Sequence, residues 1–219
     1  MTQNDASWPI NGVSTYKVAE VYATIQGEGR LVGTPMTIVR LQGCPVACHF
    51  CDQPETWNPS EGSWRFSDDI TRQVEALSPR WALITGGEPA WHDLWRLTHD
   101  LRDAGLKTAL ETSGVFPVTG VWNWICLSPK PLGALPLMPS QWIRCADEIK
   151  WIVGREQDVV GLEEFLALAA DRYSLRSGAA VSIQPISCLP KPTKICLDAL
   201  VRHPDWFLSV QVHKYVNIA

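Results

Sequence analysis

The sequence predicts an α/β fold in which parallel strands form a barrel, complete or incomplete, with helices on its outside. Short runs of β-branched and aromatic residues alternate with amphipathic helical stretches along the chain, which is typical of this class. Unusual polar residues directly follow several of the expected strands. No low-complexity linker or internal repeat divides the chain, so we expect a single domain over residues 1–219, with residues 1–17 as a flexible or peripheral N-terminal segment.

The individual elements follow from local patterns. We expect strands over residues 37–41, 81–85, 108–111, 124–127, 148–153, 181–184 and 207–212. The first helix begins at about Ser67, a favourable capping residue, and has Asp68 and Asp69 in its first turn. A second helix spans about 92–104 and ends at Gly105, because glycine readily takes the left-handed conformation found at helix ends. Apolar spacing predicts further helices over 159–170 and 193–201, and the proline-containing stretch 130–141 is expected to be a loop.

The polar residues that end the strands predict one shared pocket. In a parallel barrel, the carboxyl ends of the strands carry the loops that converge on the ligand. The alternative is that polar residues simply follow strands into surface loops. The residues concerned are Thr85, Gly86, Gly87, Glu88, Glu111, Thr112, Ser113, Ser128, Lys130, Gln184, His213 and Lys214.

Composition narrows the class of partner. Lys and Arg number 19 against 23 Asp and Glu, which gives a net charge of -4, and no basic run stands out, so no nucleic-acid partner is expected. Hydrophobic residues make up 46% of the chain, which excludes a disordered or collagen-like protein. No apolar run approaches the ~20 residues of a membrane-spanning helix, and the N-terminus lacks a secretory leader pattern. We therefore expect a cytoplasmic protein that acts on a small molecule and does not contact a membrane.

Three of the seven cysteines, Cys44, Cys48 and Cys51, form a CxxxCxxC pattern directly after the first expected strand. Three thiolates on one loop can hold a 4Fe-4S cluster and leave one iron open to a non-protein ligand, whereas a structural zinc site closes with four protein ligands. The alternatives are a zinc site completed by His49, a redox pair of Cys48 and Cys51, or three buried cysteines. The other cysteines are scattered, and we assign them no role and expect them to be buried: Cys126, Cys145, Cys188 and Cys196.

A second motif, Thr85-Gly86-Gly87-Glu88-Pro89, follows the second expected strand. Paired glycines let the backbone approach a ligand with no Cβ in the way. Together with the cysteine loop, this motif resembles the radical S-adenosylmethionine (SAM) enzymes. The resemblance implies an incomplete TIM-like barrel of the radical SAM type and a 4Fe-4S cluster whose open iron binds SAM. It also implies that electron transfer to the sulfonium releases a 5'-deoxyadenosyl radical.

Further motifs make the chain resemble the 7-carboxy-7-deazaguanine synthases, from about Val18 to the last residue. They are QGEG at 26–29, GTP at 33–35, VRLQGC at 39–44, ETSG at 111–114, SPK at 128–130, EIK at 148–150, QPIS at 184–187 and HKYVNIA at 213–219. The resemblance implies a carbon–nitrogen lyase of queuosine and deazapurine biosynthesis that converts 6-carboxy-5,6,7,8-tetrahydropterin to 7-carboxy-7-deazaguanine with loss of ammonia. Hydrogen would be removed from C6 of the pterin. A homodimer is implied as well, with flavodoxin or ferredoxin as electron donor.

The same resemblance implies the site residues. Those beside the substrate are Ile25, Gln26, Gly27, Arg40, Thr85 and the terminal Ala219. Those around SAM are Phe50, Asp52, Gly86, Gly87, Glu88, Ser128, Pro129, Lys130 and Gln184. Arg40 suits the substrate carboxylate, because a guanidinium can make two hydrogen bonds to it; the alternative is an ion pair with Glu20 or Glu28. No catalytic side chain is expected beyond the cluster and SAM.

One residue departs from the family pattern. Relatives carry Thr or Ser directly after the Cys-Asp pair, where the hydroxyl helps to hold a magnesium ion, and this sequence has Gln53. Magnesium prefers oxygen ligands in near-octahedral geometry. Three alternatives follow: Gln53 binds magnesium through its carbonyl oxygen, its amide contacts the substrate with no metal, or the substrate differs slightly.

Two other functions stay open from the sequence. Another small radical SAM enzyme, such as a glycyl-radical activase, would share the cysteine loop but has no reason for the QGEG and HKY motifs. A non-enzymatic zinc or redox module would be colourless, whereas a protein with one cluster should be brown and contain about four irons per chain.

Overall fold

The computed structural model describes residues 14–130, 141–173 and 175–218. Its strands form one sheet in the order β3-β1-β2-β4-β5-β6-β7-β8-β9. The strands are β1 (Thr15–Ile25), β2 (Pro35–Leu41), β3 (Ser63–Phe66), β4 (Trp81–Gly86), β5 (Lys107–Thr112), β6 (Trp124–Leu127), β7 (Glu148–Val153), β8 (Ala180–Pro185) and β9 (Trp206–Leu208). The α-helices are α1 (Ser67–Ala76), α2 (Trp95–Asp103), α3 (Glu156–Tyr173), α4 (Pro190–Arg202) and α5 (Val212–Val216), and short 3-10 turns lie at Pro54–Thr56, Pro89–Trp91, Gln141–Cys145 and Ile186–Cys188.

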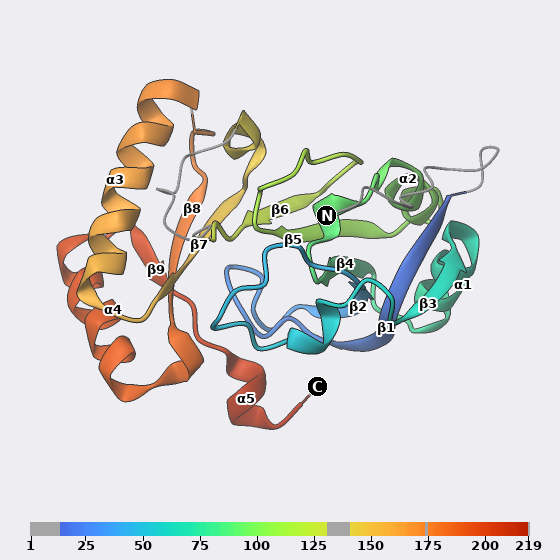
Figure 1. The fold of residues 1–219 in the computed structure, drawn as a ribbon, viewed down its shortest axis with the longest axis horizontal. Coiled ribbons are helices and arrows are strands. Elements are labelled where there is room, and N and C mark those ends of the chain that lie inside the picture. The colour runs from blue at the N-terminus through green and yellow to red at the C-terminus, as the bar shows by residue number, and fades with distance from the viewer. Residues whose placement is uncertain (1–13, 131–140, 174, 219) are drawn as a thin grey trace.

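The sheet is parallel over most of its width. From β2 to β9 each neighbouring pair runs parallel, and β1 runs antiparallel to both β2 and β3. Helices α1 to α4 pack against one side of it: α3 and α4 lie beside β7 to β9 at one end of the molecule, and α1 and α2 lie at the other end (Figure 1). This arrangement confirms the parallel α/β prediction.

Side chains on the parallel strands alternate between the helix layer and the barrel interior, as the two-residue period of a strand requires. The residues that face the helices form the main core with helix residues such as Leu97 and Leu162; they include Val39, Leu41, Ile84, Leu110, Ile149, Trp151 and Ile183. Towards the amino ends of the strands, the inward residues form a small apolar layer of Met36, Ile38, Leu83 and Ala109. Further along the same strands, the inward residues become polar, and these are Arg40, Thr85, Glu111, Lys150 and Gln184. The interior is therefore apolar at one end and polar at the other.

Two differences from the predicted elements bear on the site. The strand expected over 207–212 is wrong in its second half, because β9 ends at Leu208 and the backbone N–H of Val212 instead donates to the carbonyl of Gly27, 2.8 Å away, where α5 begins. The sequence patterns also gave no strand before residue 37, yet β1 begins at Thr15 and pairs with β2 and β3. Residues 15–17 thus belong to the sheet and not to a peripheral N-terminal segment.

Smaller differences concern helix ends. Phe66 precedes α1 in the capping position, so Ser67 is the first helical residue and its hydroxyl makes no capping bond. The helix expected from residue 92 begins at Trp95, after a 3-10 turn. Gly105 follows α2 with φ +77, as expected of a helix terminator. Of the predicted loop 130–141, residues 131–140 lie outside the described residues.

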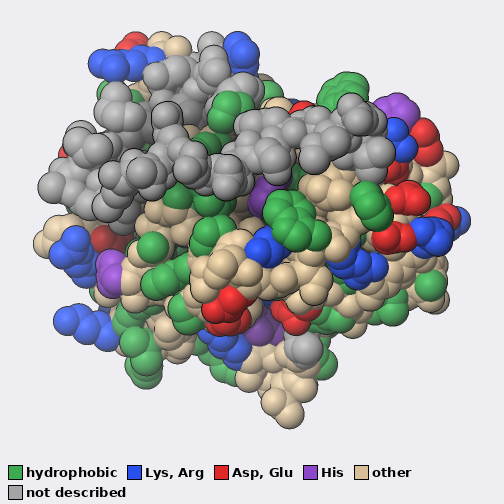
Figure 2. Space-filling model, turned by 45° about the vertical axis from the view of Figure 1, so that its right-hand side comes forward, with side chains coloured by type: hydrophobic (Ala, Val, Ile, Leu, Met, Phe, Trp, Pro, Cys, Tyr) green, Lys and Arg blue, Asp and Glu red, His purple; other side chains and the backbone are tan. Residues whose placement is uncertain are grey.

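The surface is mixed in charge. On the face shown in Figure 2, Lys and Arg side chains lie among Asp and Glu side chains over the described residues. No α-helix within the described ranges combines the length and apolar character needed to cross a membrane.

Candidate active site

A cavity of about 660 Å³ lies at the polar end of the barrel interior. Seventeen of the residues predicted for the site line it: Ile25, Gln26, Gly27, Arg40, Cys44, Cys48, Phe50, Cys51, Asp52, Gln53, Thr85, Gly86, Gly87, Glu88, Ser128, Lys130 and Gln184. Pro129 is buried but is not part of the lining. Ala219 lies outside the described residues. The convergence confirms that the polar residues at the strand ends share one pocket.

The cysteine loop forms one wall of this cavity. Backbone bonds hold its ends: the N–H of Gly43 donates to the carbonyl of Thr56 (2.8 Å), and the N–H of Cys44 donates to the carbonyl of Trp57 (3.1 Å). Within the loop, the N–H of Cys51 donates to the carbonyl of Cys48 (2.9 Å). All three cysteines are free and partly buried, and they face the cavity.

The cysteine loop is partly buried and lies near one ammonium, that of Lys130. Burial raises the pKa of the Cys48 thiol, and Cys44 and Cys51 raise it further, while the Lys130 ammonium acts in the opposite direction. Three free thiols with an ammonium beside them fit a 4Fe-4S cluster. His49 is exposed and absent from the lining, and among the residues that the structure describes no trio of His, Cys, Asp or Glu is grouped to hold a single metal ion. A zinc site completed by His49 is therefore not formed.

The glycine pair joins the cysteine loop to the end of β4. The N–H of Gly87 donates to the carbonyl of Leu41 (3.0 Å), and the N–H of Glu88 donates to the carbonyl of Gly43 (2.9 Å). A Cβ at Gly86 would clash with the carbonyl of Leu41, and one at Gly87 with the carbonyl of Gly43. The sequence suggested glycine here for approach to a ligand. In the structure glycine is also required for approach to the cysteine loop.

The Glu88 carboxylate is fully engaged within the protein. It accepts hydrogen bonds from the N–H groups of Ala90 (3.0 Å) and Ser113 (2.8 Å) and from the hydroxyls of Thr112 and Ser113. The residue is 2% exposed. Glu88 thus fixes the turn that follows β5. Glu111 lies on β5 itself and lines the cavity.

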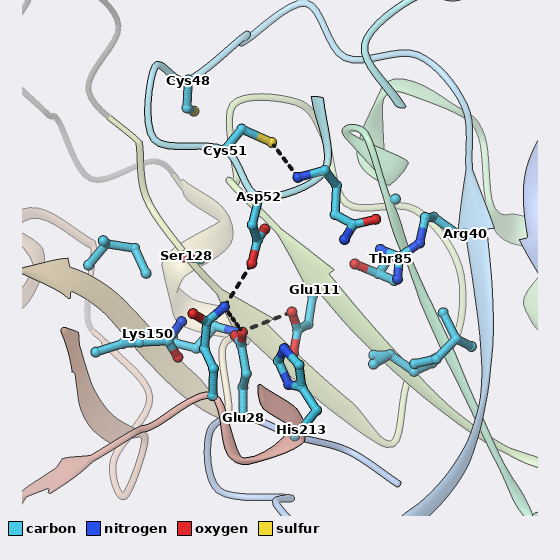
Figure 3. Close-up of a pocket in the computed structure, with 18 of the residues that line it drawn as sticks. Glu28, Arg40, Cys48, Cys51, Asp52, Thr85, Glu111, Ser128, Lys150 and His213 are labelled. Carbon is cyan, nitrogen blue, oxygen red and sulfur yellow. Dashed lines mark hydrogen bonds and ion pairs between the residues drawn. The ribbon is translucent and has the colours of Figure 1, made fainter. Parts of the chain in front are cut away.

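Opposite the cysteines, two carboxylates flank one ammonium (Figure 3). Lys150 Nζ lies 2.6 Å from Glu28 Oε2 and 3.0 Å from Glu111 Oε2, and Gln26 Nε2 donates to the other oxygen of Glu111 at 2.9 Å. Burial alone would raise the pKa of Glu28, but Lys150 and bonds from Gln211 and Gln184 lower it to about 2. Burial lowers the pKa of Lys150, and the attraction of Glu111 and Glu28 outweighs it and raises the pKa well above its usual value. Glu28 and Lys150 therefore form a buried ion pair, and the carboxyl group of Glu111 contacts the same ammonium.

Arg40 occupies a different side of the cavity, next to Thr85, its register partner on β4. Its Nε donates to Glu20 Oε1 at 2.5 Å, and its Nη2 donates to the hydroxyl of Tyr22 at 3.1 Å. The ion pair with Glu20 considered from the sequence is thus present, whereas Glu28 pairs with Lys150. The same guanidinium lines the cavity.

The helix α5 closes the cavity from outside the sheet. His213 packs on Gly27, where a Cβ would clash with the imidazole ring, and His213, Lys214 and Ile218 all line the cavity. The sequence placed His213 and Lys214 at a strand end, which is wrong, because both lie on α5. They reach the cavity nevertheless.

Sequence reasoning gave no specific binding role to several lining residues that the structure makes central: Glu28, Glu111, Lys150 and Gln211, of which only Glu111 was expected at the shared pocket. The first three lie in the QGEG, ETSG and EIK motifs, so their position in a motif was an available signal. Gln211 lies outside every motif.

The remaining cysteines divide into two groups. Cys126 and Cys196 are buried, as expected, and burial raises the pKa of Cys196 to about 12. Cys145 is exposed and Cys188 is partly buried. The expectation of burial is wrong for Cys145, because it ends a 3-10 turn at the surface.

Comparison with known proteins identifies the family. A family model described as a 4Fe-4S single cluster domain matches residues 25–121, which include the cysteine loop and the glycine pair. The 7-carboxy-7-deazaguanine synthase of Escherichia coli (strain K12) is 36% identical, over 93% of this chain and 99% of that protein. The chain belongs to the 7-carboxy-7-deazaguanine synthase family. The enzyme of the same name from Synechocystis sp. is 34% identical over 96% of this chain and 98% of that protein.

A solved structure described as the crystal structure of QueE from Escherichia coli matches with a TM-score of 0.80 and 34% identity, over 91% of this chain and 95% of that chain. This likeness confirms the incomplete barrel of the radical SAM type. Membership of the 7-carboxy-7-deazaguanine synthase family makes the chain a carbon–nitrogen lyase with a 4Fe-4S cluster and SAM as cofactors. The glycyl-radical activase and the zinc or redox module are thereby excluded.

Proposed function

We propose that the cavity converts 6-carboxy-5,6,7,8-tetrahydropterin to 7-carboxy-7-deazaguanine with loss of ammonia. The observation that carries this proposal is that three free thiols and a buried carboxylate–ammonium cluster open on one cavity from opposite sides. When bound, the cluster and SAM supply the radical that removes hydrogen from C6. The residues of this chain bind and orient the reactants and exclude water, which is the protein's part when a cofactor carries the difficult step.

The cofactor half of the site is proposed to lie beside the cysteine loop. Cys44, Cys48 and Cys51 hold the cluster, and their lining neighbours contact SAM: Phe50, Asp52, Gly87, Ser128 and Lys130. Lys130 Nζ donates to the carbonyl of Ser128 at 2.8 Å and also to its hydroxyl, so the segment after β6 keeps a fixed shape. Burial and the nearby Lys150 lower the pKa of Lys130. An anionic cluster or the SAM carboxylate would offset both effects.

The substrate half is proposed to lie between Arg40 and the buried cluster of charges. The Arg40 guanidinium holds the substrate carboxylate, because arginine retains donors beyond those used for Glu20 and Tyr22. A tetrahydropterin carries several N–H donors on its ring, and Glu111 and Glu28 supply carboxylate acceptors for them. Gln26, which directly follows β1, holds Glu111 in place through a hydrogen bond from its side-chain amide. Two acidic side chains in the lining of the cavity favour a ligand rich in N–H groups.

The residues around Gln53 do not fit a magnesium site. The neighbouring Asp52 carboxylate accepts a hydrogen bond from Gln211 (2.7 Å) and lies 3.6 Å from the Lys214 ammonium, so it is engaged within the protein. An amide oxygen alone is a poor substitute for the charged oxygen set that magnesium prefers. Of the three alternatives, we propose the second: the Gln53 amide contacts the substrate directly and no metal takes part.

Further properties rest on the sequence and on the family resemblance. We propose a homodimer, a flavodoxin or ferredoxin as the electron donor and a cytoplasmic location, and we propose that residues 1–219 form a single domain. One sheet containing residues from Thr15 to Leu208 supports the last point. Light scattering of the reconstituted protein tests the dimer.

The function is tested by anaerobic incubation of reconstituted protein with SAM, a reductant and the carboxylated pterin. We expect about four irons per chain and a deazapurine product detected by mass. Cys48→Ala should lose both the iron and the product. Iron-loaded wild-type protein that binds SAM but forms no deazapurine would contradict the proposal.

A further inference from the structure

The amide of Gln211 lies between the carboxylates of Glu28 and Asp52, which belong to opposite halves of the site; Figure 3 labels both carboxylates. Its Nε2 donates to Glu28 Oε1 at 2.8 Å and to Asp52 Oδ2 at 2.7 Å, and its Oε1 accepts from Lys214 Nζ at 2.6 Å. The residue is 4% exposed. Both donors of the amide and its carbonyl oxygen are therefore used.

The chemistry of this position requires a primary amide. Two carboxylates close to one point need a donor to each, and a side-chain amide provides two N–H groups on one nitrogen without adding charge. Glutamate would put a third acceptor and a third negative charge beside Glu28 and Asp52. Asparagine is one methylene shorter and cannot span the same distances from the same backbone position.

The two carboxylates have different surroundings. Glu28 belongs to the substrate half, because it is paired with Lys150 in the buried cluster. Asp52 follows Cys51, the last of the three cluster ligands, and precedes Gln53. Gln211 itself immediately precedes α5, whose His213 packs on Gly27. One side chain thus connects the substrate half, the cysteine loop and the helix that closes the cavity.

We propose that Gln211 is a positioning residue that couples occupation of the substrate half to the geometry of the cysteine loop, so that SAM is cleaved in step with substrate binding. The proposal rests on the function proposed above and deepens it. Gln211 acts through Glu28 and Asp52. A substrate that orders Glu28 and α5 orders Asp52 through the same amide.

Loss of this coupling has a chemical signature. Uncoupled cleavage consumes SAM, one electron from the reductant and one hydrogen atom from a donor other than the substrate, and it yields methionine and 5'-deoxyadenosine. In coupled turnover, the rearranged radical takes the hydrogen atom back from 5'-deoxyadenosine and SAM is regenerated, so little 5'-deoxyadenosine accumulates. The ratio of 5'-deoxyadenosine to deazapurine therefore measures the coupling separately from the overall rate.

The test compares reconstituted wild type with Gln211→Ala, Gln211→Glu and, as a control on the exposed side of α5, Val216→Ala. With iron per chain matched, we expect the ratio to rise at least tenfold in Gln211→Ala, because even one hydrogen bond to a charged group contributes about the free energy of a tenfold change. It should rise further in Gln211→Glu and stay at the wild-type value in Val216→Ala. Lys214→Met is a milder change, because it removes the Lys214 contacts with Gln211 and Asp52 but leaves both hydrogen bonds from Gln211 to the carboxylates in place. It should give an intermediate ratio and decides the matter if the Gln211 variants do not fold.

Hydrogen–deuterium exchange of the holoenzyme supplies a second readout. Product binding should slow exchange in residues 44–57 and 212–218 of the wild type, but only in 212–218 of Gln211→Ala. A Gln211→Ala variant with a wild-type ratio and product protection in both segments would overturn the proposal. Absence of deazapurine from iron-loaded wild type would instead reject the function, since that result does not depend on Gln211.

Discussion

Lys150 and Glu28 are 122 positions apart in the chain, yet the Lys150 ammonium lies 2.6 Å from a carboxylate oxygen of Glu28. Their side chains are only 3% and 16% exposed. Glu111 approaches the same ammonium from β5. A buried group of this kind is costly to assemble and stabilises the fold only while every member keeps its partner, so its presence indicates a role in binding.

Removal of the Lys150 ammonium should therefore destabilise the fold. Lys150→Met leaves Glu28 and Glu111 as neighbouring buried carboxylates, and we expect a loss of about 3–5 kcal/mol in the free energy of unfolding. Urea unfolding followed by tryptophan fluorescence measures it. The matched control is Lys194→Met, which removes an exposed ion pair with Asp198 and should cost about 0–1 kcal/mol. Equal losses in the two variants would show that burial of the Lys150 cluster has no energetic effect.

The ionisation of Glu28 gives a pH signature. In the folded chain its pKa is lowered from 4.5 to about 2. Because folding favours the ionised form, the stabilisation is complete above the ordinary value and is lost as the pH falls towards the folded value. Wild type should therefore lose more free energy of unfolding than Glu28→Gln between about pH 5 and about pH 3. Urea titrations of iron-free protein at each pH measure this difference, and parallel curves would contradict it.

The glycine pair should be needed to form the cysteine loop. A Cβ in Gly87→Ala clashes with the carbonyl of Gly43, so the loop must move, at a cost of about 1–3 kcal/mol. We expect less iron per chain after reconstitution and a lower melting temperature. Gly161→Ala is the control, because its nearest neighbour is Trp151 at 3.7 Å and alanine favours a helix. Full iron content in Gly87→Ala would rule out the steric argument.

Because Gln53 stands where the family pattern has Thr or Ser, turnover of this protein should differ from that of Gln53→Thr in its dependence on magnesium. Turnover of the wild type should not change when magnesium is removed by exhaustive dialysis or added back. Gln53→Thr restores the hydroxyl that the family resemblance implies, and its turnover should rise with magnesium. Wild-type turnover that depends on magnesium would instead support ligation through the Gln53 carbonyl oxygen.

The position of α5 predicts an asymmetry between tags. His213 and Ile218 line the cavity, and the terminal Ala219 was expected from the sequence to reach the substrate. A hexahistidine tag after Ala219 should therefore reduce kcat/KM more than the same tag before Met1. Steady-state kinetics of the two tagged proteins at equal iron content provide the measurement. Equal kcat/KM of the two tagged proteins would contradict the prediction that Ala219 reaches the substrate.

The sequence predicts the parallel strands well because buried strands leave a local signal. Residues 81–86 are apolar towards both the helices and the interior until Thr85, where the polar end begins. The strand β1 lacks such a signal: it pairs antiparallel with β2 and β3 and includes exposed positions such as Glu20. Its formation depends on partners elsewhere in the chain.

The same distinction holds for the site. Cys44, Cys48 and Cys51 lie on one loop, so their spacing reveals their chemistry. Gln211 contacts Asp52 and Glu28, which are 159 and 183 positions away. Only the folded chain brings these residues together, and glutamine alone suggests no chemistry.

The alternation of side chains along β7 has a further consequence for how this protein can vary. One inserted residue in that strand would turn Lys150 towards the helices and bring Ile149 or Trp151 into the cavity. Substitutions at inward positions preserve this alternation of side chains, and so do length changes in the loops beyond the strands. Insertions or deletions within the parallel strands would damage stability and chemistry together, so we expect them to be absent from functional relatives.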